Sequence, residues 1–120
     1  MSRTLNNRAV GDAYEEAAAR YLYGKGYDIL ERNFRIRTGE IDIIAFDRNE
    51  NTLVFAEVKY RNNLRNGRPA CAVTRNKQLV IMKTAQYYLF TKHLSECNCR
   101  FDVIEITGTE INHIKNAFMA

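Results

Sequence analysis

The hydrophobic and polar positions of residues 39–61 alternate in a way that predicts two β-strands joined by a turn. The polar run DRNEN at residues 47–51 is typical of the turn. On the first strand, one face carries Ile41, Ile43 and Ala45, and the other carries Glu40, Asp42, Ile44 and Phe46. On the second strand, one face carries Leu53, Phe55, Glu57, Lys59 and Arg61. Acidic residues therefore stand where a buried strand normally carries apolar ones.

The turn determines which residues of the two strands face each other. A hairpin that closes symmetrically about residues 49–50 places Asp42 opposite Glu57, and Glu40 opposite Lys59. Like charges at facing positions destabilise a sheet, and burial of an unpaired carboxylate costs several kcal/mol. We therefore expect two carboxylates and an ammonium to converge at one point, with a cation required between the carboxylates.

The rest of the pattern predicts two helices and three further strands in a single domain spanning residues 1–120. A chain of this length, 46% hydrophobic, can bury roughly two thirds of its unfolded surface. The expected elements beside the central pair are a helix over Asn7–Lys25, a strand over Tyr27–Arg37, a helix from an N-cap at Thr74 to about Phe90, and strands over Arg100–Ile106 and Glu110–Ile114. The order αβββαββ predicts a mixed α/β or α+β fold.

The first helix carries an acidic residue, Glu15, on a face that is otherwise small or apolar. Gly11, Ala18 and Leu22 share that face, whereas Asp12, Glu16 and Ala19 are expected to face solvent. We therefore expect the Glu15 side chain to point toward the body of the protein. The alternative interpretation is that Glu15 caps a loop or pairs with one of three arginines, Arg32, Arg35 or Arg37.

Charge is distributed unevenly along the chain, although the formal net charge is only +4. The segment Val58–Ser95 holds eight basic residues and no acidic one. Such a segment beside a carboxylate cluster favours a polyanionic partner, most commonly nucleic acid, with a solvated basic surface as the alternative. The candidate nucleic-acid-binding residues are Arg61 at the end of a strand, Arg65 and Arg68 in the polar loop 62–69, and Arg75 and Lys77 in the first turn of the second helix.

The cysteines and the hydropathy of the chain predict a soluble cytoplasmic protein outside the membrane. There are three cysteines, an odd number, and no apolar leader or run of about eighteen apolar residues. His93, Cys97 and Cys99 raise the hypothesis of a zinc site. Only Cys71 or His113 could complete its tetrahedral ligand set, so the sequence gives structural zinc little support.

Asp42, Glu57 and Lys59 together match the requirements of phosphodiester hydrolysis. Two carboxylates on adjacent strands provide the hard oxygen ligands that Mg²⁺ or Mn²⁺ prefers, and they leave positions for a water and a phosphate oxygen. Lys59 returns to the face of Glu57, where its ammonium can orient the water and offset developing negative charge. The spacing D-x14-E-x-K occurs by chance in many strands, and its placement on paired strands makes it more informative.

Six short motifs, specific as a set, indicate a family. They are G-x-x-x-E-x-x-A-x-x-Y-L at 11–22, G-Y-x-I-L-x-R-N at 26–33, G-E-I-D-I-I-A at 39–45, F-x-E-V-K-x-R at 55–61, R-F-D-V at 100–103 and H-x-x-N-A-F at 113–118. On these motifs the chain resembles, over nearly its whole length, the YraN-type family of small bacterial proteins. That family is assigned to the restriction-endonuclease-like superfamily and is akin to archaeal Holliday junction resolvases.

The resemblance implies a central mixed β-sheet flanked by helices and an endonuclease site that uses Mg²⁺ or Mn²⁺. Asp42, Glu57 and Lys59 match the acidic, acidic and lysine catalytic positions, and Glu15 matches a further acidic metal ligand on the first helix. The chain departs from the pattern at Tyr14, where the family usually has glycine, and no proline precedes Asp42. The implied partner is DNA, including branched or damaged DNA, and a homodimer would suit a symmetric junction.

Three functions fit the sequence. The first is a metal-dependent DNA nuclease in which Glu15, Asp42 and Glu57 bind the metal and Lys59 positions water. The second is a nucleic-acid-binding module that retains the nuclease fold without cleaving. The third is a structural protein in which Glu40, Asp42, Glu57 and Lys59 form an internal ion-pair cluster.

Overall fold

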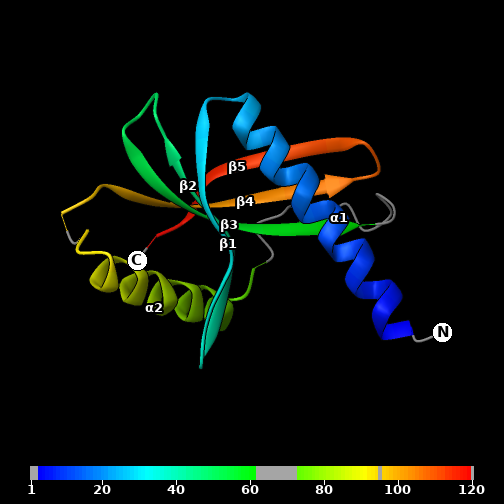
Figure 1. The fold of residues 1–120 in the computed structure, drawn as a ribbon, viewed down its shortest axis with the longest axis horizontal. Coiled ribbons are helices and arrows are strands. Elements are labelled where there is room, and N and C mark those ends of the chain that lie inside the picture. The colour runs from blue at the N-terminus through cyan, green and yellow to red at the C-terminus, as the bar shows by residue number, and fades with distance from the viewer. Residues whose placement is uncertain (1–2, 62–72, 95, 120) are drawn as a thin grey trace.

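A computed structural model describes residues 3–61, 73–94 and 96–119. It contains seven elements in the predicted order αβββαββ (Figure 1). They are α1 (Arg3–Gly24), β1 (Tyr27–Ile36), β2 (Gly39–Asp47), β3 (Thr52–Arg61), α2 (Arg75–Thr91), β4 (Cys99–Thr107) and β5 (Glu110–Phe118). The mixed α+β fold class expected from the hydrophobic pattern is confirmed, and β5 extends four residues beyond its predicted end.

The strands form one open, mixed sheet in the order β1-β2-β3-β4-β5. Neighbouring strands are antiparallel except β3 and β4, which are parallel. A parallel pair cannot be closed by a tight turn, and the segment that carries α2 provides the long connection between them. Figure 1 shows β3, β4 and β5 running across the molecule at a steep angle to β1 and β2.

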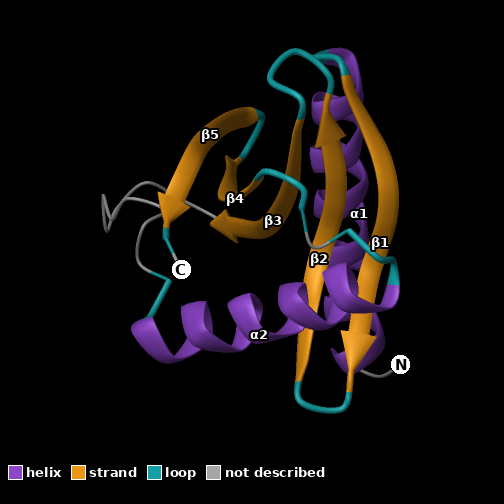
Figure 2. Ribbon diagram, turned by 90° about the vertical axis from the view of Figure 1, so that its left-hand side faces the viewer, coloured by secondary structure: helices purple, strands orange, loops and turns teal. Residues whose placement is uncertain are grey.

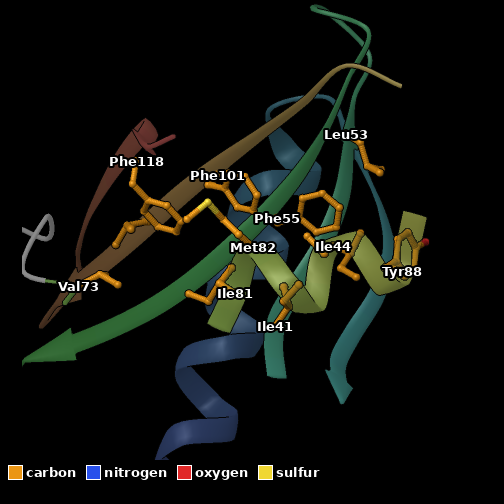
Figure 3. Packing of buried hydrophobic residues seen from close by; sticks show 12 residues of the cluster. Ile41, Ile44, Leu53, Phe55, Val73, Ile81, Met82, Tyr88, Phe101 and Phe118 are labelled. Atoms are coloured by element: carbon orange, nitrogen blue, oxygen red, sulfur yellow. The ribbon is translucent and has the colours of Figure 1, made fainter. Parts of the chain in front are cut away.

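The two helices cover opposite faces of the sheet (Figure 2). Small and apolar α1 residues, Ala18, Ala19 and Leu22, pack on one face against Ile43, Ala45, Val54, Ala56, Ile104 and Ile106. On the other face, Ile81, Met82, Ala85 and Tyr88 of α2 pack against Ile41, Ile44, Leu53, Phe55, Phe101, Val103 and Phe118 (Figure 3). The prediction that Ala19 faces solvent is wrong, because α1 lies close enough to bury it.

Two features position α2, an N-cap at its start and a close contact with β2 near its middle. Thr74 is the N-cap, as predicted, and its Oγ1 atom accepts a 3.1 Å hydrogen bond from the Lys77 backbone N–H. Farther along, Val80 and Thr84 lie so close to Gly39 that a Cβ atom at Gly39 would collide with them. Glycine at the first position of β2 therefore allows the helix to approach the sheet closely.

The register of β2 and β3 follows the symmetric hairpin predicted from the sequence. Residues 43–47 of β2 pair with residues 52–56 of β3 in that register. The ladder ends there, one position before Asp42 and Glu57 would face each other. The two carboxylates therefore lie where the strands separate rather than within the paired ladder.

Two predictions about the faces of β2 are wrong. Glu40 does not pair with Lys59, because the β2–β3 ladder ends at Ile43 and Ala56; the Glu40 side chain instead forms a 3.3 Å ion pair with Arg35 of β1. Ile41 and Ile43 do not share a face, because Ile41 packs under α2 and Ile43 under α1. Strict alternation along the strand is thus interrupted at Asp42, the residue between them.

The neighbouring strand is irregular at the same level. In β1, Asn33 has a positive φ of 54° and lies between the residues that pair with Ile41 and Ile43. Asparagine tolerates this left-handed conformation better than most residues. The irregularity therefore coincides with the change of face at Asp42, and it places Asn33 beside the candidate site.

Candidate active site

Asp42 bridges the point at which β2 and β3 separate. The backbone N–H of Val58 donates a 2.8 Å hydrogen bond to Asp42 Oδ2. A backbone donor that the strand ladder no longer pairs is thus satisfied by a side chain. This bond fixes the Asp42 carboxylate next to β3, beside Glu57.

Asp42 and Glu57 form a carboxylate pair in which Glu57 is buried and Asp42 is half-buried. Only 7% of Glu57 is exposed, and burial followed by the nearby charge of Asp42 raises the pKa of Glu57 to about 7. Burial also raises the pKa of Asp42, although the Val58 N–H and a hydrogen bond with Glu57 act in the opposite direction. A hydrogen bond between two carboxyl groups requires a proton, so the pair favours binding either one proton or another cation.

Two lysines lie beside this pair. The Nζ atom of Lys77, in the first turn of α2, lies 3.3 Å from Glu57 Oε2. Lys59 also lowers the pKa of Glu57 through its charge, although less than Lys77 does. The sequence predicted Lys59 near the carboxylates but placed Lys77 only among nucleic-acid contacts. The sequence signal for Lys77 was its position in the basic first turn of a helix, beside Arg75.

Glu15 reaches the same region from α1. Its Oε1 atom is buried and has no hydrogen-bond partner among the described residues, and burial and then the charge of Asp42 raise its pKa. The side chain of Asn33 hydrogen-bonds to Glu15 and acts in the opposite direction. Of the arginines proposed as partners, Arg32 instead donates to Glu16, at 2.7 Å. The Glu15 side chain thus points inward, as expected from the sequence.

An open groove gives access to Glu15 from the surface. Its volume is about 590 Å³. The residues that line it come from α1 and the facing ends of β1 and β2, and they are Gly11, Asp12, Glu15, Asn33, Arg35 and Glu40. An extended ligand could therefore approach the Glu15 carboxylate without any movement of the core.

The donor set suits a hard divalent cation better than a soft one. Asp42, Glu57 and Glu15 offer only oxygen ligands, and Glu15 has a buried oxygen with no hydrogen-bond partner in the described part of the chain. Among the described residues, no three acidic, histidine or cysteine side chains already form a closed metal-binding cluster. The oxygen donors therefore fit an open site for a hard divalent cation, in which water would complete the shell.

Of the other residues predicted to contact nucleic acid, the structure describes the side chain of Arg75 alone. Arg75 is exposed at the start of α2, where its Nη1 atom donates to Gln78 Oε1 at 2.9 Å. Arg65, Arg68 and the Arg61 side chain lie outside the described residues. The basic loop thus remains a sequence prediction.

A second polar cluster, which the sequence did not reveal, is buried elsewhere in the sheet. Arg100 of β4 forms 3.0 Å ion pairs with Asp47 and Asp102, and it also donates to Tyr27. His113 Nε2 lies 2.7 Å from Asp102 Oδ2. His113 is thus committed to a carboxylate, and the described part of the chain shows no cluster that pairs it with Cys97 and Cys99 around a metal.

Comparison with known proteins identifies the family. Residues 14–106 match the model of a family described as "Uncharacterised protein family UPF0102". The chain belongs to the UPF0102 family. This membership confirms the YraN-type family predicted from the sequence motifs. Among the described residues of this UPF0102 chain, neither helix is long and apolar enough to span a membrane.

Several UPF0102 proteins are similar over nearly their whole length. That of Lachnoclostridium phytofermentans is 50% identical over 117 residues, covering 97% of this chain and 98% of the relative. That of Trichlorobacter lovleyi is 50% identical over 117 residues, covering 93% of this chain and 91% of the relative. That of Clostridioides difficile is 45% identical over 116 residues, covering 95% of this chain and 100% of the relative.

Proposed function

We propose that this UPF0102 chain is a divalent-metal-dependent nuclease of the restriction-endonuclease-like superfamily, which hydrolyses phosphodiester bonds in DNA. The observation that carries the proposal is the pair of half-buried Asp42 and buried Glu57 at the point where β2 and β3 separate. Such a pair is costly without a bound cation, and two carboxylates on adjacent strands are a common way to hold Mg²⁺ or Mn²⁺.

Asp42 and Glu57 would hold the metal, and Glu15 would contribute its unpartnered oxygen to the outer part of the site. A bound divalent cation would activate water and offset negative charge on the phosphate. The Val58 N–H keeps Asp42 oriented, because it donates a hydrogen bond to Asp42 Oδ2. The protein thus supplies a preorganised set of oxygen ligands.

The lysines have separate roles in this proposal. Lys59 lies two residues after Glu57 on β3, where its ammonium can orient a water or contact a phosphate oxygen. Lys77 neutralises part of the charge of Glu57 through its 3.3 Å contact. The basic segment Val58–Ser95 would hold the phosphate backbone, with no sequence preference implied. A two-fold dimer would present two such sites to a symmetric junction.

A nuclease panel tests the proposal. The substrates are labelled single-stranded, linear duplex, flap and four-way-junction DNA, each with Mg²⁺, Mn²⁺ or EDTA. We expect metal-dependent cleavage by the wild type, and a loss of at least about 100-fold in Lys59→Ala and Glu57→Gln. Lys115→Ala, which removes an exposed lysine from β5, serves as the matched control and should cleave normally. No cleavage of any substrate by the folded wild type would contradict the proposal.

A non-cleaving binding module is the second candidate. The contact between Lys77 and Glu57 favours it, because this ammonium already offsets one carboxylate without a metal. In that case DNA would be retained in a strongly salt-dependent manner while no product formed. Filter binding at low and high salt, performed on the same panel, distinguishes the two functions.

A further inference from the structure

Two tyrosines stack on each other at the edge of the candidate active site. The ring centroids of Tyr14 on α1 and Tyr60 on β3 lie 4.4 Å apart, and the ring planes differ by only 9°. Tyr14 covers one face of the Tyr60 ring, yet 43% of Tyr60 remains exposed. Part of Tyr60 is therefore accessible to a ligand next to a preformed stack.

The pair lies on the α1 side of the sheet, next to Glu15 in sequence. Tyr14 directly precedes Glu15 on α1, and Glu15 lines the open groove. Side chains alternate along β3, so Tyr60 points to the face that α1 covers, whereas Glu57 points to the face of α2 and contacts Lys77. A base stacked on Tyr60 would thus lie on the α1 side of the sheet, as does the groove at Glu15.

The sequence around Tyr60 is basic, which suits a nucleic-acid strand. Lys59 and Arg61 flank it in sequence, and Tyr60 lies within the segment Val58–Ser95, which has no acidic residue. Proteins that bind single strands combine basic groups along the phosphates with aromatic side chains on which bases stack. A fully paired duplex offers a base face only at its two ends, because its other bases stack on each other.

Packing of α1 on the sheet does not require an exposed tyrosine pair. The buried contacts are made farther along the helix, where Ala18, Ala19 and Leu22 meet the apolar face of the sheet. The Tyr14–Tyr60 stack lies outside this fully buried set, with Tyr14 partly buried against it. Most of the stabilising apolar burial between α1 and the sheet is therefore independent of Tyr60.

We propose that Tyr14 and Tyr60 form a base-stacking platform that selects nucleic acid with unpaired nucleotides, such as a single strand, a flap or an open junction. The platform rests on the proposed nuclease only in that the same nucleic-acid strand would also reach the carboxylates. Base binding itself requires no metal and no cleavage. The two ideas can therefore fail separately.

Binding to two oligonucleotides in EDTA tests the platform. One is a single strand of about 12 nucleotides containing 2-aminopurine, and the other is the same sequence fully paired. We expect the wild type to quench 2-aminopurine fluorescence and Tyr60→Ala to weaken single-strand binding by about 5-fold to 100-fold. Duplex affinity should change less than about 2-fold. Tyr60→Phe should restore both quenching and affinity.

Tyr23→Ala is the matched control, because Tyr23 is 71% exposed near the other end of α1. It should bind like the wild type. If Tyr60→Ala does not fold, Tyr60→Leu retains apolar bulk without an aromatic face and should lose quenching. Unchanged quenching in the folded Tyr60 variants, or an equal loss for single strand and duplex, would overturn the platform.

The nuclease panel separates the two failures. Cleavage that Lys59→Ala abolishes, together with unchanged single-strand binding by Tyr60→Ala, would reject the platform and leave the nuclease intact. Loss of quenching in Tyr60→Ala without cleavage by the wild type would reject the nuclease and leave the platform intact.

Discussion

Glu15 and Glu16 are adjacent on α1 but lie in opposite surroundings. The Oε1 atom of Glu15 is buried without a hydrogen-bond partner among the described residues, whereas Glu16 accepts hydrogen bonds from Arg20 at 2.9 Å and Arg32 at 2.7 Å. One carboxylate therefore has its partners in the protein, and the other has an oxygen available to a ligand. This difference provides a matched pair of variants.

Glu15→Gln should weaken the binding of Mn²⁺, and Glu16→Gln should not. A cation that binds only the folded state stabilises it by about 2.7 kcal/mol at a concentration one hundred times its Kd. We expect Mn²⁺ to raise the Tm of the wild type and of Glu16→Gln, and to raise the Tm of Glu15→Gln less. Differential scanning calorimetry across a Mn²⁺ titration checks this. Equal responses of the two variants would exclude Glu15 from the site.

The pKa of Glu57 predicts how stability depends on pH. Its pKa is raised in the folded protein, to about 7 from an ordinary 4.5, so the folded state holds this proton more tightly than the unfolded state does. The stabilising contribution is complete below about pH 4.5 and is lost as the pH rises through about 7. Above that range the charged pair costs up to about 3 kcal/mol.

Metal-free wild type and Glu57→Gln should therefore diverge between about pH 5 and about pH 8. The variant should gain stability relative to the wild type as the pH rises, because a glutamine cannot become charged. Urea denaturation at both pH values measures the difference. Glu96→Gln, a substitution at an exposed position, is the control. A constant difference between wild type and Glu57→Gln would show that Glu57 titrates normally.

Lys77 should matter most when no metal is bound. Its ammonium lies 3.3 Å from the buried Glu57, so Lys77→Gln leaves the carboxylate pair without that cation. We expect Lys77→Gln to lower the free energy of unfolding at about pH 8 by on the order of 1 kcal/mol. Saturating Mn²⁺ should remove most of that loss. A loss that is the same with and without Mn²⁺ would mean that Lys77 and the metal do not act on the same charge.

The sequence predicted the central hairpin well because a symmetric turn and two alternating strands leave only one register. Residues 43–47 pair with residues 52–56 as that register requires. It did not predict the change of face between Ile41 and Ile43, since alternation assumes an unbroken strand. The irregularity coincides with the positive φ of Asn33 on the neighbouring strand, which no pattern within β2 reveals.

The contact between Lys77 and Glu57 was missed for a different reason. Periodicity shows which face of a helix is apolar, and it does not show which strand the helix start approaches. Thr74 caps α2 as predicted, but the position of that end over Glu57 depends on the connection between β3 and α2. The buried cluster around Arg100 is likewise assembled from separate elements, with Asp47 on β2 and His113 on β5.

Arg100 should be essential for stability. It is buried with Asp47 and Asp102, so Arg100→Met removes the ion pair of Asp47 and leaves Asp102 with His113 and the Asn116 N–H. Breaking a buried ion pair in this way costs roughly 3–5 kcal/mol. Thermal and urea denaturation should show this loss, and Arg48→Met, which removes an exposed ion pair with Asp28, should cost less than about 1 kcal/mol. Equal effects of the two substitutions would show that the Arg100 cluster is not a major source of stability.

The central claim is that Asp42 and Glu57 hold a divalent cation between them. Crystals of the wild type grown with Mn²⁺ at about pH 8, where the pair is charged, allow the metal to be located by its anomalous scattering. We predict an anomalous peak within coordination distance of both carboxylates, and its absence in Glu57→Gln crystals. A well-ordered site without a peak, with Lys77 still bound to Glu57, would contradict the claim.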